Sequence, residues 1–178
     1  MVNIIKEVAK RLEDAGIAYM FTGSTALNFY AIPRMTRDVD IVIELYQKDA
    51  KKVFGFFEKD FYIDEAMVSD AIKRHGMFNI IHSESVFKVD FIIRKDNPYR
   101  LEEFKRKKQI AFEGMEIFIV TPEDLILSKL AWIKETMSEL QMRDVKNILQ
   151  AVKGLDFSYL DKWAEYLNVK EIFNQVKT

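Results

Sequence analysis

The spacing of apolar residues changes repeatedly along the first 120 positions of the chain. Apolar residues three or four apart predict amphipathic helices, whereas alternation or short β-branched runs predict strands. By these criteria short helices and short strands are mixed in this part of the sequence. The predicted helices cover residues 3–15, 25–30 and 48–59, with a helical or irregular stretch at 67–76; the predicted strands cover 17–22, 38–45, 61–66, 77–82, 86–94 and a hairpin at 107–120 that turns at Glu113-Gly114.

The pattern changes at Thr121, after which only helical spacing occurs. Thr121, Pro122 and the two acidic residues that follow are typical of a helix N-terminus. Helices are predicted over 121–137, 140–153, 156–167 and 169–177. The sequence therefore predicts an α+β fold, with a small mixed sheet flanked by helices over residues 1–120 and a helical C-terminal part over 121–178 that packs on this core.

Composition narrows the class of protein without naming a function. The 178 residues are 49% hydrophobic and carry a formal net charge of −1, so no global basic field marks a nucleic-acid binder. The chain has no cysteine, which excludes disulfides, thiolate zinc sites and cysteine nucleophiles. Neither a signal peptide nor a membrane span is recognisable, so we expect a cytoplasmic protein without a membrane partner.

The first candidate site is a pair of acids inside an apolar strand, "DVDIVI". Side chains alternate along a strand, so Asp38 and Asp40 face the same side, with Cα atoms about 6.6 Å apart, while Val39 and Ile41 face a core. Two such carboxylates repel each other unless a cation lies between them. The alternative is a solvated or capping role at the end of a strand.

A third acid, Asp90, lies in the apolar strand "KVDFII". If this strand neighbours the first, Asp90 joins Asp38 and Asp40. Hard carboxylate oxygens suit Mg²⁺, or Mn²⁺ in its place. Three carboxylates are able to hold two such ions roughly 3.5–4 Å apart, the arrangement used for phosphoryl and nucleotidyl transfer.

Gly23-Ser24 lies where a strand meets a helix N-terminus, a place where backbone N–H groups favour an anion. Glycine allows close approach of a phosphate, and the Ser24 hydroxyl is able to donate a hydrogen bond to it. A plain turn with a helix cap is the competing interpretation.

The order of these motifs resembles the polymerase-β-like nucleotidyltransferase superfamily. Gly23-Ser24, thirteen intervening residues, Asp38-Val39-Asp40 and a later Asp90 follow its signature. The lead-in Arg34-x-Thr36-x-Asp38 and the segment "TPEDLILSKLAWIKETMSELQMRDVKNIL" resemble the AbiEii-like branch, which is related to toxins of type IV toxin–antitoxin pairs.

The resemblance implies a role for each matching residue. Gly23 and Ser24 hold the triphosphate together with Arg34 and Thr36, while Asp38, Asp40 and Asp90 bind the metals and Asp90 helps deprotonate the attacking hydroxyl. In the AbiEii-like branch the helical Asp-x-x-x-x-Lys motif and a following aspartate are also functional. That places Lys129 on phosphate and lets Asp144 complete the site.

Two of these residues have competing interpretations. Lys129 lies among apolar neighbours, four residues from both Leu125 and Ile133, so its stem is expected to be buried with the ammonium in water. Asp144 lies beside the core positions Val145 and Ile148, and without the resemblance its pattern favours a solvated helix face.

The segment "YRLEEFKRKKQI" also permits two interpretations. Its basic residues are able to contact an RNA backbone, or the segment is a charged, solvated helix–strand junction balanced by Glu102 and Glu103. The basic residues are Arg100, Lys105, Arg106, Lys107 and Lys108.

The leading hypothesis is a Mg²⁺-dependent nucleotidyltransferase that uses a nucleoside triphosphate. The acceptor hydroxyl stays open between an RNA end (tRNA included), a protein and a small molecule, as in antibiotic-modifying enzymes. The alternative is a non-catalytic nucleotide- or partner-binding module of toxin–antitoxin type. A cognate antitoxin is a candidate partner in either case.

Overall fold

A single mixed sheet organises the computed structural model, which describes residues 1–177. The sheet has seven strands in the order β3-β4-β5-β2-β1-β7-β6. β1 runs parallel to β7 and β2 runs parallel to β5, whereas the other neighbours are antiparallel. The strands are β1 Tyr19–Phe21, β2 Asp38–Ile43, β3 Phe61–Tyr62, β4 Met77–His82, β5 Lys88–Ile93, β6 Lys108–Phe112 and β7 Met115–Ile119.

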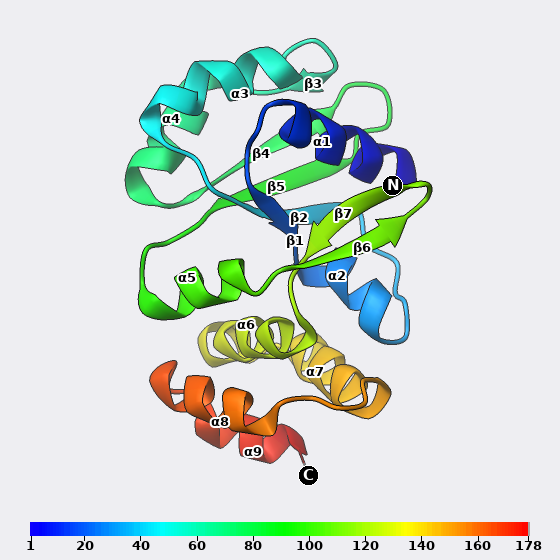
Figure 1. Cartoon of the computed structure of the whole chain (residues 1–178), viewed down its shortest axis with the longest axis vertical. Coiled ribbons are helices and arrows are strands. Elements are labelled where there is room, and N and C mark those ends of the chain that lie inside the picture. Colours follow the sequence, from blue (N-terminus) through cyan, green and yellow to red (C-terminus); the bar gives the residue numbers. More distant parts are fainter. Residues whose placement is uncertain (178) are drawn as a thin grey trace.

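Helices cover both faces of this sheet (Figure 1). α1, α3 and α4 lie on one side, whereas α2 and the C-terminal helices α6 to α9 lie on the other. The helices are α1 Val2–Asp14, α2 Gly23–Tyr30, α3 Ala50–Phe57 after the 3₁₀ turn Gln47–Asp49, α4 Glu65–Arg74, α5 Pro98–Lys105, α6 Pro122–Thr136, α7 Glu139–Ala151, α8 Phe157–Tyr166 and α9 Lys170–Lys177. The predicted α+β class is confirmed.

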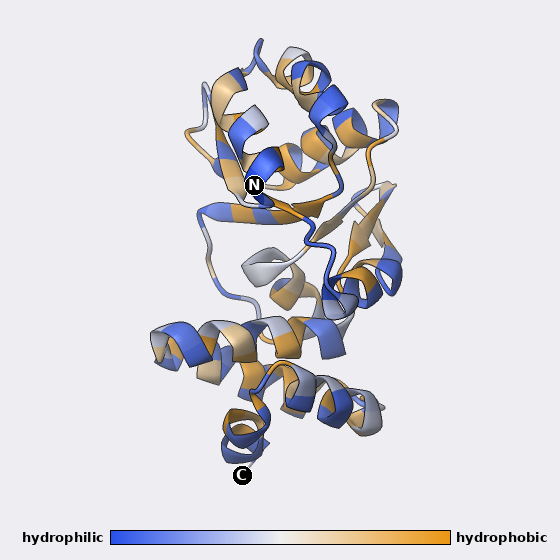
Figure 2. Ribbon diagram, turned by 90° about the vertical axis from the view of Figure 1, so that its left-hand side faces the viewer, coloured by the Kyte–Doolittle hydropathy of each residue, from blue (hydrophilic) through white to orange (hydrophobic). Residues whose placement is uncertain are grey.

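Alternation along the strands builds a core on each face of the sheet. Val39 and Ile41 of β2 belong to the first core, with α1, α3 and α4. Val42 and Met20 belong to the second core, which they share with α2 and the C-terminal helices. Figure 2 shows the matching pattern on the helices, which are banded in hydrophobic and hydrophilic colours. Because Asp38 and Asp40 alternate with Val39 and Ile41, both acids lie on the face of the second core.

The second core extends across residue 120, the predicted boundary between the two parts of the chain. Leu27 of α2 and Tyr99 of α5 pack in the same cluster as Leu127 of α6 and Leu160 of α8. The helical C-terminal part therefore packs on the sheet through a shared apolar interior, and the division at residue 120 stays a prediction.

Most predicted elements are present, with two informative differences. α2 begins at Gly23 rather than Thr25, which places Gly-Ser inside the first helical turn. α5 was predicted only as a charged junction, yet Asn97 caps it by accepting from the Arg100 backbone N–H, and Pro98 occupies its first turn. Across the described residues, no helix combines the length and apolar character needed to cross a membrane.

Candidate active site

The sheet register brings the predicted acids together. Asp40 of β2 is the direct partner of Asp90 on the parallel neighbour β5, and Asp38 is the partner of Lys88. Residues opposite one another on adjacent strands share a face, so Asp38, Asp40, Lys88 and Asp90 form a square of side chains on the α2 side. We call Asp38, Asp40 and Asp90 the aspartate triad.

Gly23 gives the triad its close contact with α2. The Gly23 backbone has a φ of +57°, and a Cβ atom there would lie 2.1 Å from Asp40 Oδ2. No real side chain fits that distance, so only glycine allows the first turn of α2 to approach the Asp40 carboxylate. The Thr22 N–H also donates to the Asp40 carbonyl at 2.9 Å, which fixes the start of α2 against β2.

The environment of Asp40 is costly for a lone carboxylate. Burial raises the pKa of Asp40, and the neighbouring charges of Asp90 and Asp38 raise it further. The backbone N–H of Ser24 and the charge of Lys129 act in the opposite direction. A bound cation would relieve this repulsion, so the donor chemistry fits a hard divalent metal.

Lys88 supplies the positive charge within the square. Its ammonium lies 2.8 Å from Asp90 Oδ2 and 3.9 Å from Asp38 Oδ1. Within residues 1–177, no three His, Cys, Asp or Glu side chains are grouped closely enough to hold a metal ion. The fold thus places the triad on one face, and the nearest counter-charge there is a lysine.

A second cluster joins α2, α6 and α7 beside the triad. Asp144 Oδ2 accepts from Lys129 Nζ at 2.8 Å and from Arg34 Nη2 at 3.2 Å. The same Arg34 nitrogen lies 2.5 Å from Ser24 Oγ, and Lys129 also donates to Gln141 Oε1 at 2.8 Å. We call Ser24, Arg34, Lys129, Gln141 and Asp144 the Asp144 cluster.

Burial excludes the solvent-exposed alternatives for the Lys129 ammonium and the Asp144 carboxylate. Lys129 is 4% exposed and Asp144 is 1% exposed, so neither a snorkelling lysine nor a solvated acid is correct. Burial lowers the pKa of Lys129, and the bond to Asp144 partly offsets that effect. The two helices therefore hold a buried ion pair that faces the Ser24 end of α2.

The loop after α2 positions Arg34 and Thr36. Asn28 holds the Arg34 backbone through two hydrogen bonds, at 2.9 and 3.1 Å. Arg34 Nε is buried and has no hydrogen-bond partner among the described residues. Thr36 Oγ1 lies 3.1 Å from the Asp38 carbonyl and 3.3 Å from its N–H, so Thr36 orders the start of β2.

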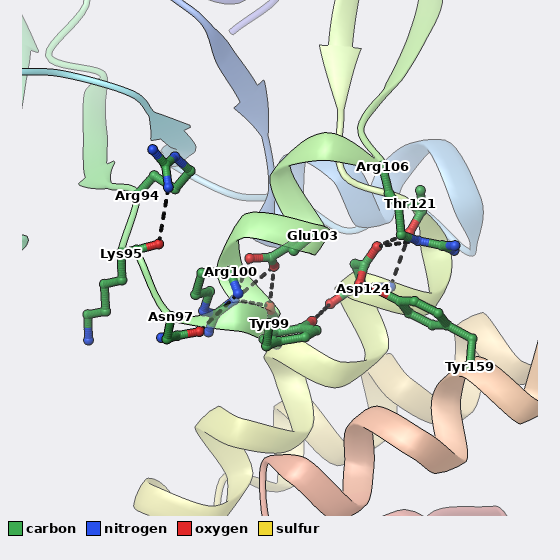
Figure 3. Close-up of polar contacts among 11 residues, drawn as sticks. Arg94, Lys95, Asn97, Tyr99, Arg100, Glu103, Arg106, Thr121, Asp124 and Tyr159 are labelled. Carbon is green, nitrogen blue, oxygen red and sulfur yellow. Dashed lines mark hydrogen bonds and ion pairs between the residues drawn. The ribbon is translucent and has the colours of Figure 1, made fainter.

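Asp124, the acid of the Asp-x-x-x-x-Lys motif, lies away from this site. It is fully buried and accepts from Tyr159 Oη at 2.7 Å and Thr121 Oγ1 at 2.6 Å. Arg106 Nε donates to it at 3.1 Å, and Figure 3 shows these side chains converging between α5, α6 and α8. Asp124 thus anchors the N-terminus of α6, the helix that carries Lys129.

The two arginines of the basic segment form ion pairs within the fold. Arg100 pairs with the buried Glu103 at 2.7 Å, which corrects the expectation that Glu103 is solvated. Arg106 pairs with Asp124 and lies 3.8 Å from the ring centroid of Tyr159 (Figure 3). Lys105 and Lys108 are exposed. The two arginines therefore stabilise the α5–α6–α8 junction, whereas the exposed lysines stay available for an RNA backbone.

Sequence reasoning missed two members of the site and one contact within it. Lys88 stands two residues before Asp90, so strand alternation was a signal that it lies on the triad face. Gln141 stands three residues before Asp144 on α7, a spacing that shares a helix face. The packing of Asp40 against Gly23 had no sequence signal beyond the glycine itself.

The comparisons with known proteins agree with this architecture. The sequence matches the AbiEii family, described as nucleotidyl transferase toxins of type IV toxin–antitoxin systems, over residues 10–146. This chain belongs to the AbiEii nucleotidyltransferase family, and the resemblance inferred from its motifs is confirmed. No curated protein matches the sequence significantly.

Several solved structures share the fold. A nucleotidyltransferase-like antigenic protein from Paracoccidioides brasiliensis aligns with a TM-score of 0.58 at 15% identity, over 83% of this chain and 72% of its own. The lincosamide antibiotic adenylyltransferase LnuA aligns with a TM-score of 0.58 at 12% identity, over 85% of this chain and 98% of its own. The antibiotic-resistance factor ANT(2")-Ia, solved in complex with adenylyl-2"-tobramycin, aligns with a TM-score of 0.55 at 10% identity, over 96% of this chain and 98% of its own. The fold is that of a nucleotidyltransferase.

Proposed function

We propose that this nucleotidyltransferase moves a nucleotidyl group from a nucleoside triphosphate to an acceptor hydroxyl with a divalent metal held by the aspartate triad. The observation that carries the proposal is the register of Asp40 with Asp90, beside the glycine-dependent start of α2. A helix N-terminus that favours anions then lies next to acids that favour cations. A metal–triphosphate complex presents both charges.

Asp38, Asp40 and Asp90 are the residues that would hold the metal. Mg²⁺, or Mn²⁺ in its place, supplies charge stabilisation on the transferring phosphoryl group and on the pyrophosphate. The raised pKa of Asp40, caused by burial and by its acidic neighbours, supports a cation in that position.

The Asp144 cluster would bind the phosphates. Lys129 and Arg34 carry the positive charge, and the partnerless Arg34 Nε offers a buried donor. Ser24 Oγ lies at the N-terminus of α2, within reach of Arg34. In this arrangement Asp144 positions the two cations, while Gly23 and Thr36 shape the backbone around them.

The reaction is a substitution at the α-phosphorus. The acceptor hydroxyl loses its proton to the Asp90 carboxylate, and its oxygen forms a bond to the α-phosphorus. The bond between that phosphorus and the oxygen bridging to the β-phosphate breaks, and pyrophosphate leaves with the electron pair. Lys129 and Arg34 are placed to stabilise the negative charge that develops on the phosphates.

The acceptor is proposed as a class, a hydroxyl on RNA (tRNA included), on a protein or on a small molecule. Membership of the AbiEii toxin family supports a cognate antitoxin as partner. LnuA and ANT(2")-Ia, which modify antibiotics, share only the fold with this chain at these identities.

Transfer of label is the test. The protein is incubated with Mg²⁺ and each labelled nucleoside triphosphate, alone and with tRNA, beside a D38N/D40N control. We expect labelled product with the unmodified protein and none with the control. If neither protein yields product while both still bind nucleotide, the non-catalytic binding module is the correct interpretation; absence of both binding and transfer in folded protein contradicts the proposal.

A further inference from the structure

Lys88 occupies a distinctive place on the triad face. It is the Cα partner of Asp38 across the β2–β5 ladder and stands two residues before Asp90 on its own strand. Its ammonium is 2.8 Å from Asp90 and 3.9 Å from Asp38, so one cation bridges acids on two strands. The hydrogen bond to Asp90 raises the pKa of Lys88, with the charges of Asp38 and Asp40 adding to the effect.

The exposure of the square is uneven. The side chain of Asp90 is 10% exposed, whereas Lys88 is 38% exposed and Asp38 is 49% exposed. Lys88 therefore approaches Asp90 from the solvent side. Its flexible four-carbon stem lets the ammonium move without any change in the strand.

We propose that Lys88 is a built-in counter-ion that a divalent metal must displace from Asp90 and Asp38, and that the released ammonium pairs with the phosphates of the bound nucleotide. This inference rests on the metal site proposed above. Lys88 thereby weakens binding of the metal alone and strengthens its dependence on the triphosphate.

Charge balance at the triad links metal binding to nucleotide binding. Without a ligand, Lys88 offsets one of the three carboxylate charges of the triad. A metal that arrives alone breaks the Lys88–Asp90 pair and leaves an ammonium beside a dication, which repel each other. A triphosphate that arrives with the metal supplies negative charge for both, so the two ligands are expected to bind with positive coupling.

The experiment measures Mn²⁺ affinity by electron paramagnetic resonance or calorimetry, with and without a non-hydrolysable nucleoside triphosphate. The variants are Lys88→Met, Lys88→Arg and Lys95→Met. Lys95 is exposed and lies outside the triad, so its variant controls for loss of one positive charge. A thermal melt of each variant checks folding.

We expect Lys88→Met to bind Mn²⁺ alone about two- to five-fold more tightly, the scale of a partly exposed ion pair that no longer has to be broken. Lys88→Arg binds it no more tightly than the unmodified protein, because arginine competes for the carboxylates in the same way. The nucleotide is expected to tighten Mn²⁺ binding less in Lys88→Met than in the unmodified protein.

Three results overturn the inference, and they differ in what else they imply. Unchanged or weaker Mn²⁺ binding in Lys88→Met means that Lys88 has only a structural role, while the proposed metal site stands. Absence of Mn²⁺ binding in every variant removes both the counter-ion role and the metal site. Equal gains in Lys88→Met and Lys95→Met also overturn it, because general charge then explains the effect.

Discussion

At the scale of single residues, Gly23 and Asp40 constrain each other. The Asp40 carboxylate fills the space that a Gly23 side chain would need, and the Gly23 backbone has a left-handed φ of +57°. Replacement of Gly23 therefore combines backbone strain with displacement of a triad member. The same residue that starts α2 thus determines where one proposed metal ligand lies.

Gly23→Ala is expected to reduce nucleotidyl transfer at least about 100-fold, the cost associated with misplacing a reactive group by an ångström. Gly16→Ala is the matched control, because Gly16 has a φ of +64° but nothing within 4 Å of an added Cβ. Both variants should lose about 1 kcal/mol of stability from the backbone conformation. Equal activity in the two variants would falsify the proposed contact.

Asp40→Asn should stabilise the metal-free protein while abolishing transfer. Burial and the charge of Asp90 raise the pKa of Asp40 in the folded protein above its pKa in the unfolded chain. At pH values between these two pKa values the folded protein binds more protons than the unfolded chain. The free energy of unfolding therefore falls as pH rises through this window. Above this window the neutral amide of Asp40→Asn removes the destabilising effect of a buried carboxylate charge beside Asp90. We expect a gain of about 1 kcal/mol near pH 7, or about 2–4 °C in Tm.

Chemical denaturation in EDTA measures this gain. The difference between Asp40→Asn and the unmodified protein should shrink as pH falls through the window, where Asp40 itself becomes neutral. A variant that is less stable at neutral pH without metal would contradict the repulsion inferred for the triad.

Residue patterns predicted the triad because strand alternation fixes the face of each side chain. Asp38 and Asp40 were placed on one face from "DVDIVI", and Asp90 of "KVDFII" was expected to join them if the two strands were neighbours. The register shows that they are neighbours, with Asp40 opposite Asp90. The partner of those charges was not predicted, because the position of the Lys88 ammonium depends on its rotamer and on both strands. Local sequence determines neither the rotamer nor the pairing of the two strands.

At the scale of elements, α6 and α7 are joined by a buried charge pair rather than by apolar contacts alone. The Asp144 carboxylate forms ion pairs with both Lys129 and Arg34. The charge of Arg34 contributes to the lowered pKa of Lys129. Loss of Asp144 leaves two cations facing each other. Loss of Lys129 still leaves Asp144 paired with Arg34.

Asp144→Asn is therefore expected to cost about 3–5 kcal/mol of stability, and Lys129→Met less than half of that. Urea denaturation of both variants, with Lys146→Met on the exposed side of α7 as control, measures the difference. The double variant should be more stable than Asp144→Asn alone, since it removes one of the stranded cations. Equal costs for the two single variants would argue against this account of the cluster.

Element boundaries were predictable where caps mark them. Thr121 caps α6 as the sequence indicated, and its Oγ1 accepts from the Asp124 N–H. α5 was missed because its charges suggested a solvated junction, whereas Glu103 and Arg100 are satisfied by each other and by Ser128. Burial of a charged pair depends on distant elements and leaves no local pattern.

At the scale of the whole molecule, the sheet and the C-terminal helices provide the two halves of one proposed site. The triad comes from β2 and β5. The Asp144 cluster comes from α2, the loop after it, α6 and α7, and these three helices share the second core. α2 connects the halves, because its first turn contacts Asp40 through Gly23 and Arg34 through Ser24. Packing of the C-terminal helices therefore sets the distance between the proposed metal and phosphate positions.

The central claim is that these two halves bind one metal–nucleotide complex. A crystal structure with Mg²⁺ and a non-hydrolysable nucleoside triphosphate tests it most directly. The account predicts metal density between Asp38, Asp40 and Asp90, with the phosphates at Ser24, Arg34 and Lys129 and the Lys88 ammonium moved away from Asp90. A nucleotide bound elsewhere, such as the surface groove lined by Gln47, Lys51 and Ser69, with Lys88 still on Asp90, would contradict it.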